Sequence, residues 1–336
     1  MDQTNRRTAE EFADLIGRTK TEIHKVIVGQ EELIDQVLQC IFCQSHALLM
    51  GVPGLAKTLL VTTISQVIGI TSRRIQFTPD LMPSDITGTE VIQEDPESGR
   101  KQFVFVEGPV FANLILADEI NRAPAKTQAA LLESMQERQV SAGRKRHLLP
   151  VPFFVLATQN PIEQEGTYNL PEAQLDRFMF LINVDYPETA DEVDVLRRTT
   201  TNYRDEPKQV MDGEQIIRFQ KVIRDVLVRD DIYDYVIRLV QATRVSKECV
   251  LPYCKEWLAW GAGPRAGQNL LLGAKARALF LGRSYIITSD IQAVAKPVFR
   301  HRIIANYAAL SEGITTDMVV DEILKSVPVP RDTVKA

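Results

Sequence analysis

A glycine-rich loop between two apolar segments is the strongest constraint on the fold of this chain. Residues 47–50 (ALLM) form a short apolar run, residues 51–58 (GVPGLAKT) supply a turn, and an amphipathic segment follows. The apolar run predicts a buried strand, and the periodic segment predicts a helix. Backbone N–H groups of a loop that opens a helix form a binding site for phosphate. For the loop alone, a glycine turn before a helix with a surface lysine is the simpler alternative.

The last residues of the loop carry the chemistry of phosphate binding. Lys57 would meet the β- and γ-phosphates of ATP, and Thr58 would ligate Mg²⁺. Ala56 stands where the general pattern has its last glycine. Because alanine tolerates positive φ poorly, we expect ordinary backbone angles there. We assign the whole loop to nucleotide binding: Gly51, Val52, Pro53, Gly54, Leu55, Ala56, Lys57 and Thr58.

Two adjacent acids end a second apolar run. Residues 114–117 (LILA) precede Asp118 and Glu119, which places both carboxylates at the carboxyl edge of a parallel sheet, where ligands bind. We expect Asp118 to hold Mg²⁺ through water and Glu119 to polarise the attacking water. A strand followed by a solvated acidic turn is common by itself. The phosphate loop upstream makes a catalytic pair the better interpretation.

Two polar residues follow later elements. Asn160 comes after the apolar strand 153–158, where its amide could orient the hydrolytic water and sense the γ-phosphate. Arg177 ends a short helix. Because an arginine that neutralises transition-state charge accelerates phosphoryl transfer by roughly 10³–10⁵, Arg177 is the candidate arginine finger. A salt bridge to Asp176 is the structural alternative.

The element patterns divide the chain near Pro187. Before it, buried strands alternate with helices, which predicts a parallel α/β sheet; the expected strands are 47–50, 74–78, 113–117, 153–157 and 178–184. After it, the patterns are helical, at 191–198, 213–227, 231–245 and 266–281. We therefore expect an α/β domain over residues 1–186, with an N-terminal helix, and a smaller all-helical lid domain over residues 187–336. Polar segments 93–102 and 141–147 predict hairpins.

Composition and charge limit the other protein classes. No segment approaches the about 18 apolar residues of a membrane span, and the N-terminus has no apolar stretch of a secretory signal. We therefore expect a soluble, cytoplasmic protein. The net charge of -5 argues against a whole-protein electrostatic grip on nucleic acid. Cys40 and Cys43 lie in an apolar run, so we interpret them as core residues and expect neither structural zinc nor disulfides.

Longer segments resemble the MoxR family of AAA+ ATPases. They are residues 76–88 (QFTPDLMPSDITG), 108–113 (GPVFAN), 116–137 (LADEINRAPAKTQAALLESMQE) and 157–161 (ATQNP). The resemblance extends from about Ile27 to Pro330, and the alanine in the phosphate loop also fits it. It implies a P-loop AAA+ nucleotide domain with a helical lid, assembled into a homo-oligomeric ring, usually a hexamer, that binds ATP between neighbours.

The resemblance also implies roles for further residues. Residues 263–266 (GPRA) resemble the family's second sensor motif, so Arg265 would contact the γ-phosphate of its own subunit; a surface arginine at a helix start is the alternative. Gly29 and Gln30 would flank the adenine. The family is associated with chaperone-like remodelling or metal-cofactor insertion in client proteins, often with a von Willebrand factor A domain partner. Nothing in these residues names the client.

Three other functions are less consistent with the sequence. A nucleic-acid translocase or loader would use the basic tip Arg144, Lys145 and Arg146 on a predicted hairpin. Such a tip is commonly a solvated turn, and the chain lacks an appended DNA-binding domain, so we do not expect nucleic acid as a partner. A nucleotide-gated module without hydrolysis is disfavoured by the complete set of catalytic residues. A bacterial enhancer-binding activator would carry a GAFTGA loop, which this sequence does not contain.

Overall fold

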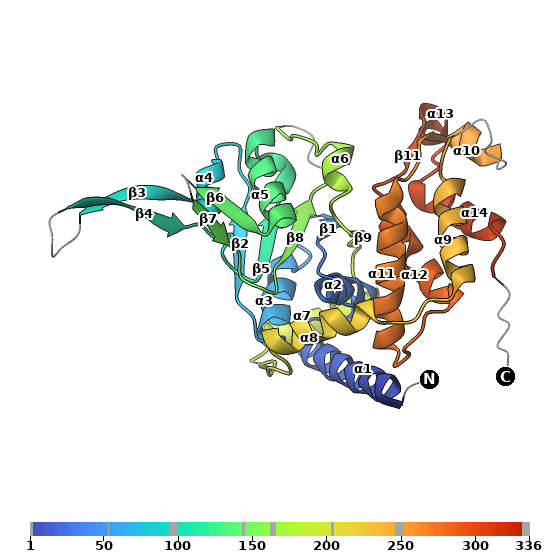
Figure 1. Ribbon diagram of the computed structural model, residues 1–336, viewed down its shortest axis with the longest axis horizontal. Helices are drawn as coiled ribbons and strands as arrows, with labels where there is room; N and C mark the ends of the chain where they lie inside the picture. Colours follow the sequence, from blue (N-terminus) through green and yellow to red (C-terminus); the bar gives the residue numbers. More distant parts are fainter. Residues whose placement is uncertain are drawn as a thin grey trace.

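A five-stranded parallel sheet forms the centre of the first part of the protein, in the order β2-β5-β8-β1-β9 (Figure 1). The computed structural model describes residues 3–52, 54–94, 100–142, 145–161, 166–202, 205–245 and 252–330. The strands are β1 (Ala47–Met50), β2 (Ser72–Gln76), β5 (Leu114–Asp118), β8 (Phe154–Gln159) and β9 (Phe180–Asn183). All five predicted strands are therefore present, and the parallel α/β class is confirmed.

Each face of the sheet is covered by helices, because strand residues alternate between two apolar clusters. In β5, Leu114 and Leu116 belong to one cluster, and Ile115 and Ala117 belong to the other. The helices on the first side are α1 (Gln3–His24), α2 (Glu31–Phe42) and α3 (Lys57–Val67), and those on the second are α4 (Pro83–Thr87), the 3-10 helix η1 (Ile120–Arg122) and α5 (Ala125–Glu137).

The second part of the protein is a helical lid (Figure 1). After the short α6 (Glu172–Leu175) and β9, the helices are α7 (Thr189–Thr200), α8 (Gly213–Arg224), α9 (Asp230–Ala242), α10 (Pro252–Trp257), α11 (Pro264–Phe280), α12 (Thr288–Phe299), α13 (Tyr307–Ser311) and α14 (Thr316–Ser326). The predicted helical lid is confirmed, and it also contains a short antiparallel pair, β10 (Leu258–Trp260) with β11 (Ile304–Ala305). Within the described parts of the chain, no helix is both long and apolar enough to span a membrane.

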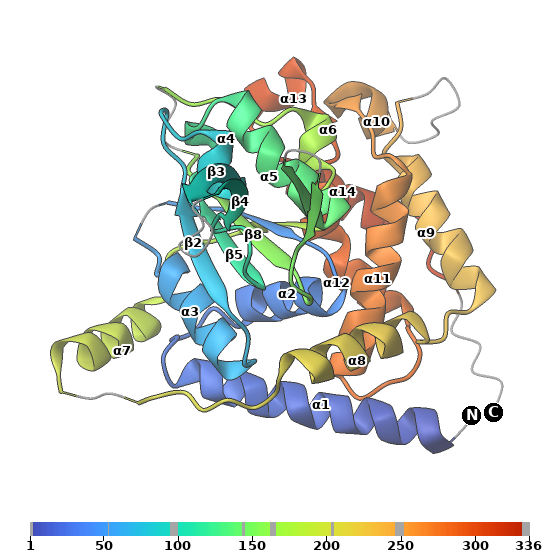
Figure 2. The same ribbon diagram turned by 60° about the vertical axis from the view of Figure 1, so that its left-hand side comes forward.

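The N-terminal helix joins the two parts. The ring of Phe12 in α1 contacts Phe42 of α2 at 4.9 Å and Phe219 of α8 at 4.3 Å, measured between ring centroids. It also contacts Phe280 at the end of α11, at 5.7 Å. Helices α1 and α8 lie side by side in both views (Figure 2). One apolar cluster therefore runs from the sheet into the lid, and the boundary near residue 187 stays a prediction.

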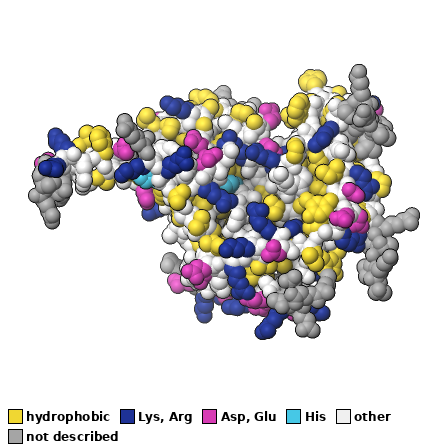
Figure 3. Space-filling model, in the orientation of Figure 1, with side chains coloured by type: hydrophobic (Ala, Val, Ile, Leu, Met, Phe, Trp, Pro, Cys, Tyr) yellow, Lys and Arg dark blue, Asp and Glu magenta, His cyan; other side chains and the backbone are white. Residues whose placement is uncertain are grey.

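Both predicted hairpins are present. Strands β3 (Gly88–Glu94) and β4 (Lys101–Glu107) pair in antiparallel register and form an arm that projects from the body (Figures 1 and 3). Strands β6 (Gln139–Ala142) and β7 (Lys145–Leu148) form the second hairpin. The tips, residues 95–99 and 143–144, lie outside the described residues, and Arg144 with them.

The two cysteines near the end of α2 are core residues, as predicted. Cys40 and Cys43 are buried free thiols. Burial raises the pKa of Cys43 to about 12, so this thiol stays protonated at neutral pH. The pair packs as small apolar side chains.

A buried histidine links three elements of the sheet domain. His46, directly before β1, accepts a hydrogen bond from the backbone N–H of Val155 in β8 through Nδ1, at 3.0 Å. Its Nε2 lies 3.3 Å from the carbonyl oxygen of Met135 in α5, so the proton is on Nε2. Because burial disfavours the cation, the pKa of His46 is lowered from 6.5 to about 4.

The neutral state of His46 predicts a pH-dependent stability. Between about pH 6.5 and 4 the unfolded state binds a proton at this residue and the folded state does not. The free energy of unfolding should therefore fall as pH decreases through this window, by about 1.4 kcal/mol per pH unit for this group. His46→Gln should reduce the slope in urea unfolding between pH 7 and 5, by up to about that amount near pH 5. The buried His301, whose pKa burial also lowers, should keep part of the slope. An unchanged slope in His46→Gln would contradict the assignment.

Candidate active site

Segments that follow different strands line one cavity at the carboxyl edge of the sheet. Its volume is about 360 Å³, and its lining residues are Gly54, Ala56, Lys57, Thr58, Arg74, Asp118, Glu119 and Asn160. The parallel register aligns the strand ends, with Met50 opposite Gln159 and Gln76 opposite Asp118. The loop after β1, the acids after β5 and the amide after β8 therefore meet, as the sequence patterns predicted.

The glycine-rich loop folds over its own lysine. Nζ of Lys57 donates to the carbonyl oxygen of Gly51 at 2.7 Å. Burial lowers the pKa of Lys57, while the nearby carboxylates of Asp118 and Glu119 act in the opposite direction. At Gly51 a Cβ atom would lie 2.6 Å from the carbonyl oxygen of Val184. Only glycine therefore fits at this position, where the loop follows β1. Pro53 lies outside the described residues.

The expectation of ordinary backbone angles at Ala56 was wrong. Ala56 has φ 52° and ψ 25°, in the left-handed region, and stands directly before α3. Its carbonyl oxygen already accepts the N–H of Leu60 at 2.9 Å. The loop therefore enters the helix through a left-handed residue, which costs an L-residue with a side chain about 1–2 kcal/mol.

The two carboxylates are held by side chains from neighbouring strands and from η1. Asp118 accepts a hydrogen bond from Oγ1 of Thr158 at 2.7 Å and pairs with Nη2 of Arg74, also at 2.7 Å. Oε2 of Glu119 accepts from Nε2 of Gln76 at 2.9 Å and from Nη1 of Arg122 at 3.0 Å. Both acids are thereby fixed at the cavity wall.

Sequence reasoning missed Arg74 and Gln76 as site residues. Both lie on β2, two positions apart, so they share one face of that strand beside the end of β5. Only the pairing of β2 with β5, which places Gln76 opposite Asp118, brings these two residues to the site. No local pattern in residues 72–76 marks them.

The donors at the cavity suit a magnesium ion. Thr58 offers a hydroxyl oxygen and Asp118 a carboxylate, and both line the same cavity. Mg²⁺ prefers hard oxygen ligands of this kind and keeps several waters when it also binds phosphate. The residues present therefore fit the ion predicted for this site.

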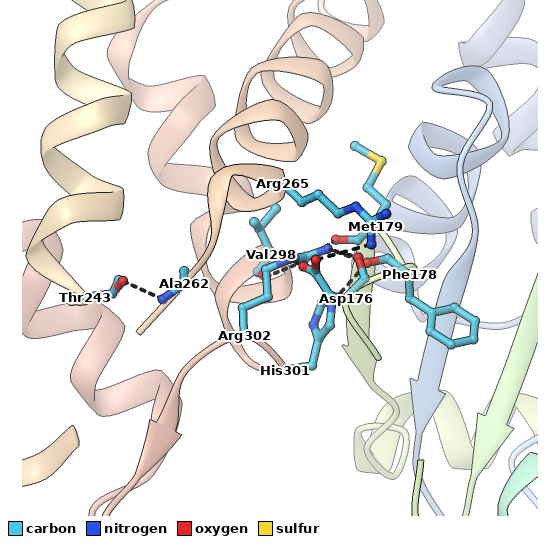
Figure 4. Close-up of polar contacts among 9 residues, drawn as sticks. All are labelled: Asp176, Phe178, Met179, Thr243, Ala262, Arg265, Val298, His301 and Arg302. Atoms are coloured by element: carbon cyan, nitrogen blue, oxygen red, sulfur yellow. Dashed lines mark hydrogen bonds and ion pairs between the residues drawn. The ribbon is translucent and has the colours of Figure 1, made fainter. Parts of the chain in front are cut away.

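The two predicted arginines lie in a different place. Arg177 and Arg265 line a second cavity, of about 190 Å³, together with Asp176. Nη1 of Arg177 donates to the carbonyl oxygen of Leu132 in α5 at 2.9 Å. Nη1 of Arg265 lies 3.4 Å from Oδ2 of Asp176 (Figure 4). Neither arginine lines the cavity of the phosphate loop. Arg265 therefore lies away from the phosphate-loop cavity, and its contact with a γ-phosphate stays a prediction.

The residues expected beside the adenine lie between α1 and α2. Gly29 and Gln30 both have left-handed backbones, with φ 61° and 55°. A Cβ atom at Gly29 would lie 2.1 Å from Oδ2 of Asp191 in α7, so the carboxylate of Asp191 packs against the glycine. They are not among the lining residues of the phosphate-loop cavity.

Comparisons with known proteins agree with this architecture. Residues 46–180 match the ATPase family associated with various cellular activities (AAA), and residues 253–323 match an AAA lid domain. Chaperone MoxR1 of Mycobacterium tuberculosis is 45% identical over 92% of this chain and 81% of its own. Protein MoxR of Methylorubrum extorquens is 31% identical over 95% of this chain and 96% of its own. A crystal structure from Cytophaga hutchinsonii, named as a candidate ATPase, superposes with a TM-score of 0.89 at 43% identity, covering 97% of this chain and 98% of that one.

The backbone of Ala56 can be tested by substitution. Ala56→Gly removes the steric cost of the left-handed conformation, so ATP affinity should be retained. Ala56→Val places a β-branched residue at positive φ, and ATP affinity should fall by about tenfold. Titration calorimetry measures both. Wild-type affinity in the valine variant would show that residue 56 does not adopt this conformation in solution.

Proposed function

Because the chain belongs to the MoxR family of AAA+ ATPases, we propose that it hydrolyses ATP in a site shared between neighbouring subunits and thereby remodels a protein client. One observation carries the proposal. Lys57, Thr58, Asp118, Glu119 and Asn160 come from separate segments of the chain and line a single cavity. Each is of the type that phosphoryl transfer requires at its position.

The roles follow from the position and chemistry of each group. Lys57 binds the β- and γ-phosphates, and the loop N–H groups surround them. Thr58 and Asp118 hold Mg²⁺, which supplies charge neutralisation on the phosphate oxygens when bound. Glu119, fixed by its hydrogen bonds to Gln76 and Arg122, polarises the attacking water.

The shared site is inferred from the distribution of positive charge. Arg177 and Arg265 lie together on a cavity that is separate from the phosphate loop. Beyond Lys57 and Mg²⁺, phosphoryl transfer gains from an arginine that neutralises the charge developing on the γ-phosphate. Arg74 also lines the phosphate-loop cavity, but it is paired with Asp118. We therefore propose that both arginines face the phosphate held by the neighbouring subunit, in a homo-oligomeric ring that is usually a hexamer in this family.

The client is proposed to be a protein. One similar protein is named a chaperone. The projecting hairpin carries Ile92 and Phe103, which are 63% and 72% exposed and lie opposite each other, so they offer an apolar surface to a polypeptide. The family resemblance suggests a client or partner with a von Willebrand factor A domain. It also suggests metal-cofactor insertion as the outcome. A nucleic-acid translocase is not favoured, because the basic tip on β7 is the one feature that suggests it.

Two variants separate binding from hydrolysis. Lys57→Ala should abolish ATP binding in calorimetry, because the loop loses its only positively charged side chain. Glu119→Gln should bind ATP and lose turnover, since the amide cannot act as a base. Unchanged ATP binding in Lys57→Ala would refute the assignment of the phosphate loop.

A mixed ring tests the shared site. Arg177→Ala and Lys57→Ala should each be inactive alone, whereas co-expression of the two should restore part of the hydrolysis. A subunit with an intact loop, from Arg177→Ala, can then lie beside a Lys57→Ala subunit that still supplies its arginine. Phosphate release by tandem-purified mixed rings is the measurement. If mixed rings form and remain inactive, Arg177 does not act between subunits, and Arg122 becomes the next candidate.

A further inference from the structure

Arg302, a lid arginine that belongs to no recognised motif, uses its whole guanidinium group in hydrogen bonds. Arg302 follows α12, and its side chain is 1% exposed. Nε donates to Oδ1 of Asp176 at 2.8 Å, and Nη2 donates to the carbonyl oxygens of Asp176 and Phe178 at 3.1 and 2.6 Å. Nη1 donates to the carbonyl oxygens of Met179 and Val298 at 3.0 and 2.6 Å (Figure 4). All five N–H donors of the group therefore have acceptors.

Four of these five acceptors lie in the segment that carries Arg177. Residues 176–179 join α6 to β9 and belong to neither a helix nor a strand, so their carbonyl groups lack regular partners. Arg302 supplies donors to three of them, and Nε2 of His301 donates to Phe178 as well, at 3.0 Å. The backbone at Arg177 is thus held from the lid.

The carboxylate of Asp176 also contacts Arg265, which lines the same cavity as Arg177. Asp176 pairs with Arg302 at 2.8 Å and with Arg265 at 3.4 Å. The pair with Arg302 is buried on the arginine side, whereas the side chain of Arg265 is 48% exposed. Removing a partner from a buried charge is far more costly than breaking an exposed pair. Asp176 therefore stays with Arg302 and leaves Arg265 free to move to an anion.

The start of α11 is held independently. The N–H of Ala262 donates to Oγ1 of Thr243, at the end of α9, at 2.8 Å (Figure 4). This bond anchors the residues just before Arg265 within the lid. Arg265 is thus carried by the lid itself, and Arg177 is tied to the lid through Arg302.

We propose that Arg302 is a positioning residue that couples the lid to Arg177 and Arg265. The lid of one subunit thereby determines where these two arginines lie relative to the phosphate-loop cavity of the neighbouring subunit. The inference rests on the proposed shared site. Arg302 touches no substrate in this scheme; it acts through the backbone of residues 176–179 and the carboxylate of Asp176. Its loss should therefore impair the subunit that supplies arginines, and spare the one that supplies the loop.

Mixed rings test this asymmetry directly. The starting pair is Arg177→Ala, which supplies the loop, and Lys57→Ala, which supplies the arginines. Adding Arg302→Met to the Lys57→Ala subunit should lower the restored hydrolysis by about tenfold or more, because small displacements of a reacting group have large effects on rate. Adding Arg302→Met to the Arg177→Ala subunit should leave most of the restored hydrolysis.

Arg300 supplies the matched control. It is also a lid arginine, donates to the carbonyl oxygen of Leu181 in β9 at 3.1 Å and pairs with Asp317 at 2.7 Å, but it does not bond to residues 176–179. Arg300→Met in the Lys57→Ala subunit should retain the restored hydrolysis. Arg302→Lys keeps the charge without the planar fork and should show the same asymmetry if the methionine variant does not fold.

The outcomes distinguish the two levels of the proposal. The positioning role is overturned if Arg302→Met lowers the restored hydrolysis equally in the Lys57→Ala subunit and in the Arg177→Ala subunit, or in neither of them. Both of these results leave the shared site intact. The positioning role is also overturned if Arg300→Met has the same effect as Arg302→Met. Inactivity of the starting pair, in rings that demonstrably contain both subunits, overturns the shared site and the role of Arg302 with it.

Discussion

Parallel pairing of β1, β5 and β8 is the constraint on which the site depends. Parallel strands end at a common edge, so the segments that follow them meet although they lie far apart in the chain. The register is tight: Ala117 lies opposite Ala157, and Gln76 opposite Asp118. A slip of one residue would exchange Leu114 and Leu116 with Ile115 and Ala117 between the two apolar clusters. The burial of these alternating side chains therefore also fixes where the carboxylates lie.

A second constraint is the way in which the lid joins the sheet domain. One apolar cluster, which includes Phe12, makes the contact continuous on the side of α1. On the side of α6 the contact is polar and is made by Arg302 with residues 176–179. An apolar contact tolerates small sliding movements, whereas the four directed hydrogen bonds from Arg302 to residues 176–179 do not. The polar contact is therefore the place where a lid movement would be transmitted to Arg177.

Much of the fold was predictable because it follows from local periodicity. Strands such as β1 and helices such as α2 carry their patterns in consecutive residues, and Asp118 was recognisable as the polar end of an apolar run. The left-handed backbone of Ala56 was missed because the connection between β1 and α3 overrides the preference of alanine. The two-residue strand β11 is too short to show any alternation.

What depends on pairing in space could not be predicted from the sequence. Arg74 reaches Asp118 only because β2 lies beside β5, and nothing in its own segment indicates this. The position of Arg265 depends on how α11 is placed relative to α6, which no local pattern encodes. Arg302 has no motif at all, and its importance is visible only through its acceptors.

The central claim is that ATP is hydrolysed at a site to which two subunits contribute. The most direct test is the rate of ATP hydrolysis per subunit, measured over a dilution series in which sedimentation reports the state of assembly. The rate per subunit should fall toward zero as assemblies dissociate to monomers, since an isolated subunit lacks the arginines of its neighbour. A rate per subunit that stays constant in fully dissociated monomers would contradict it.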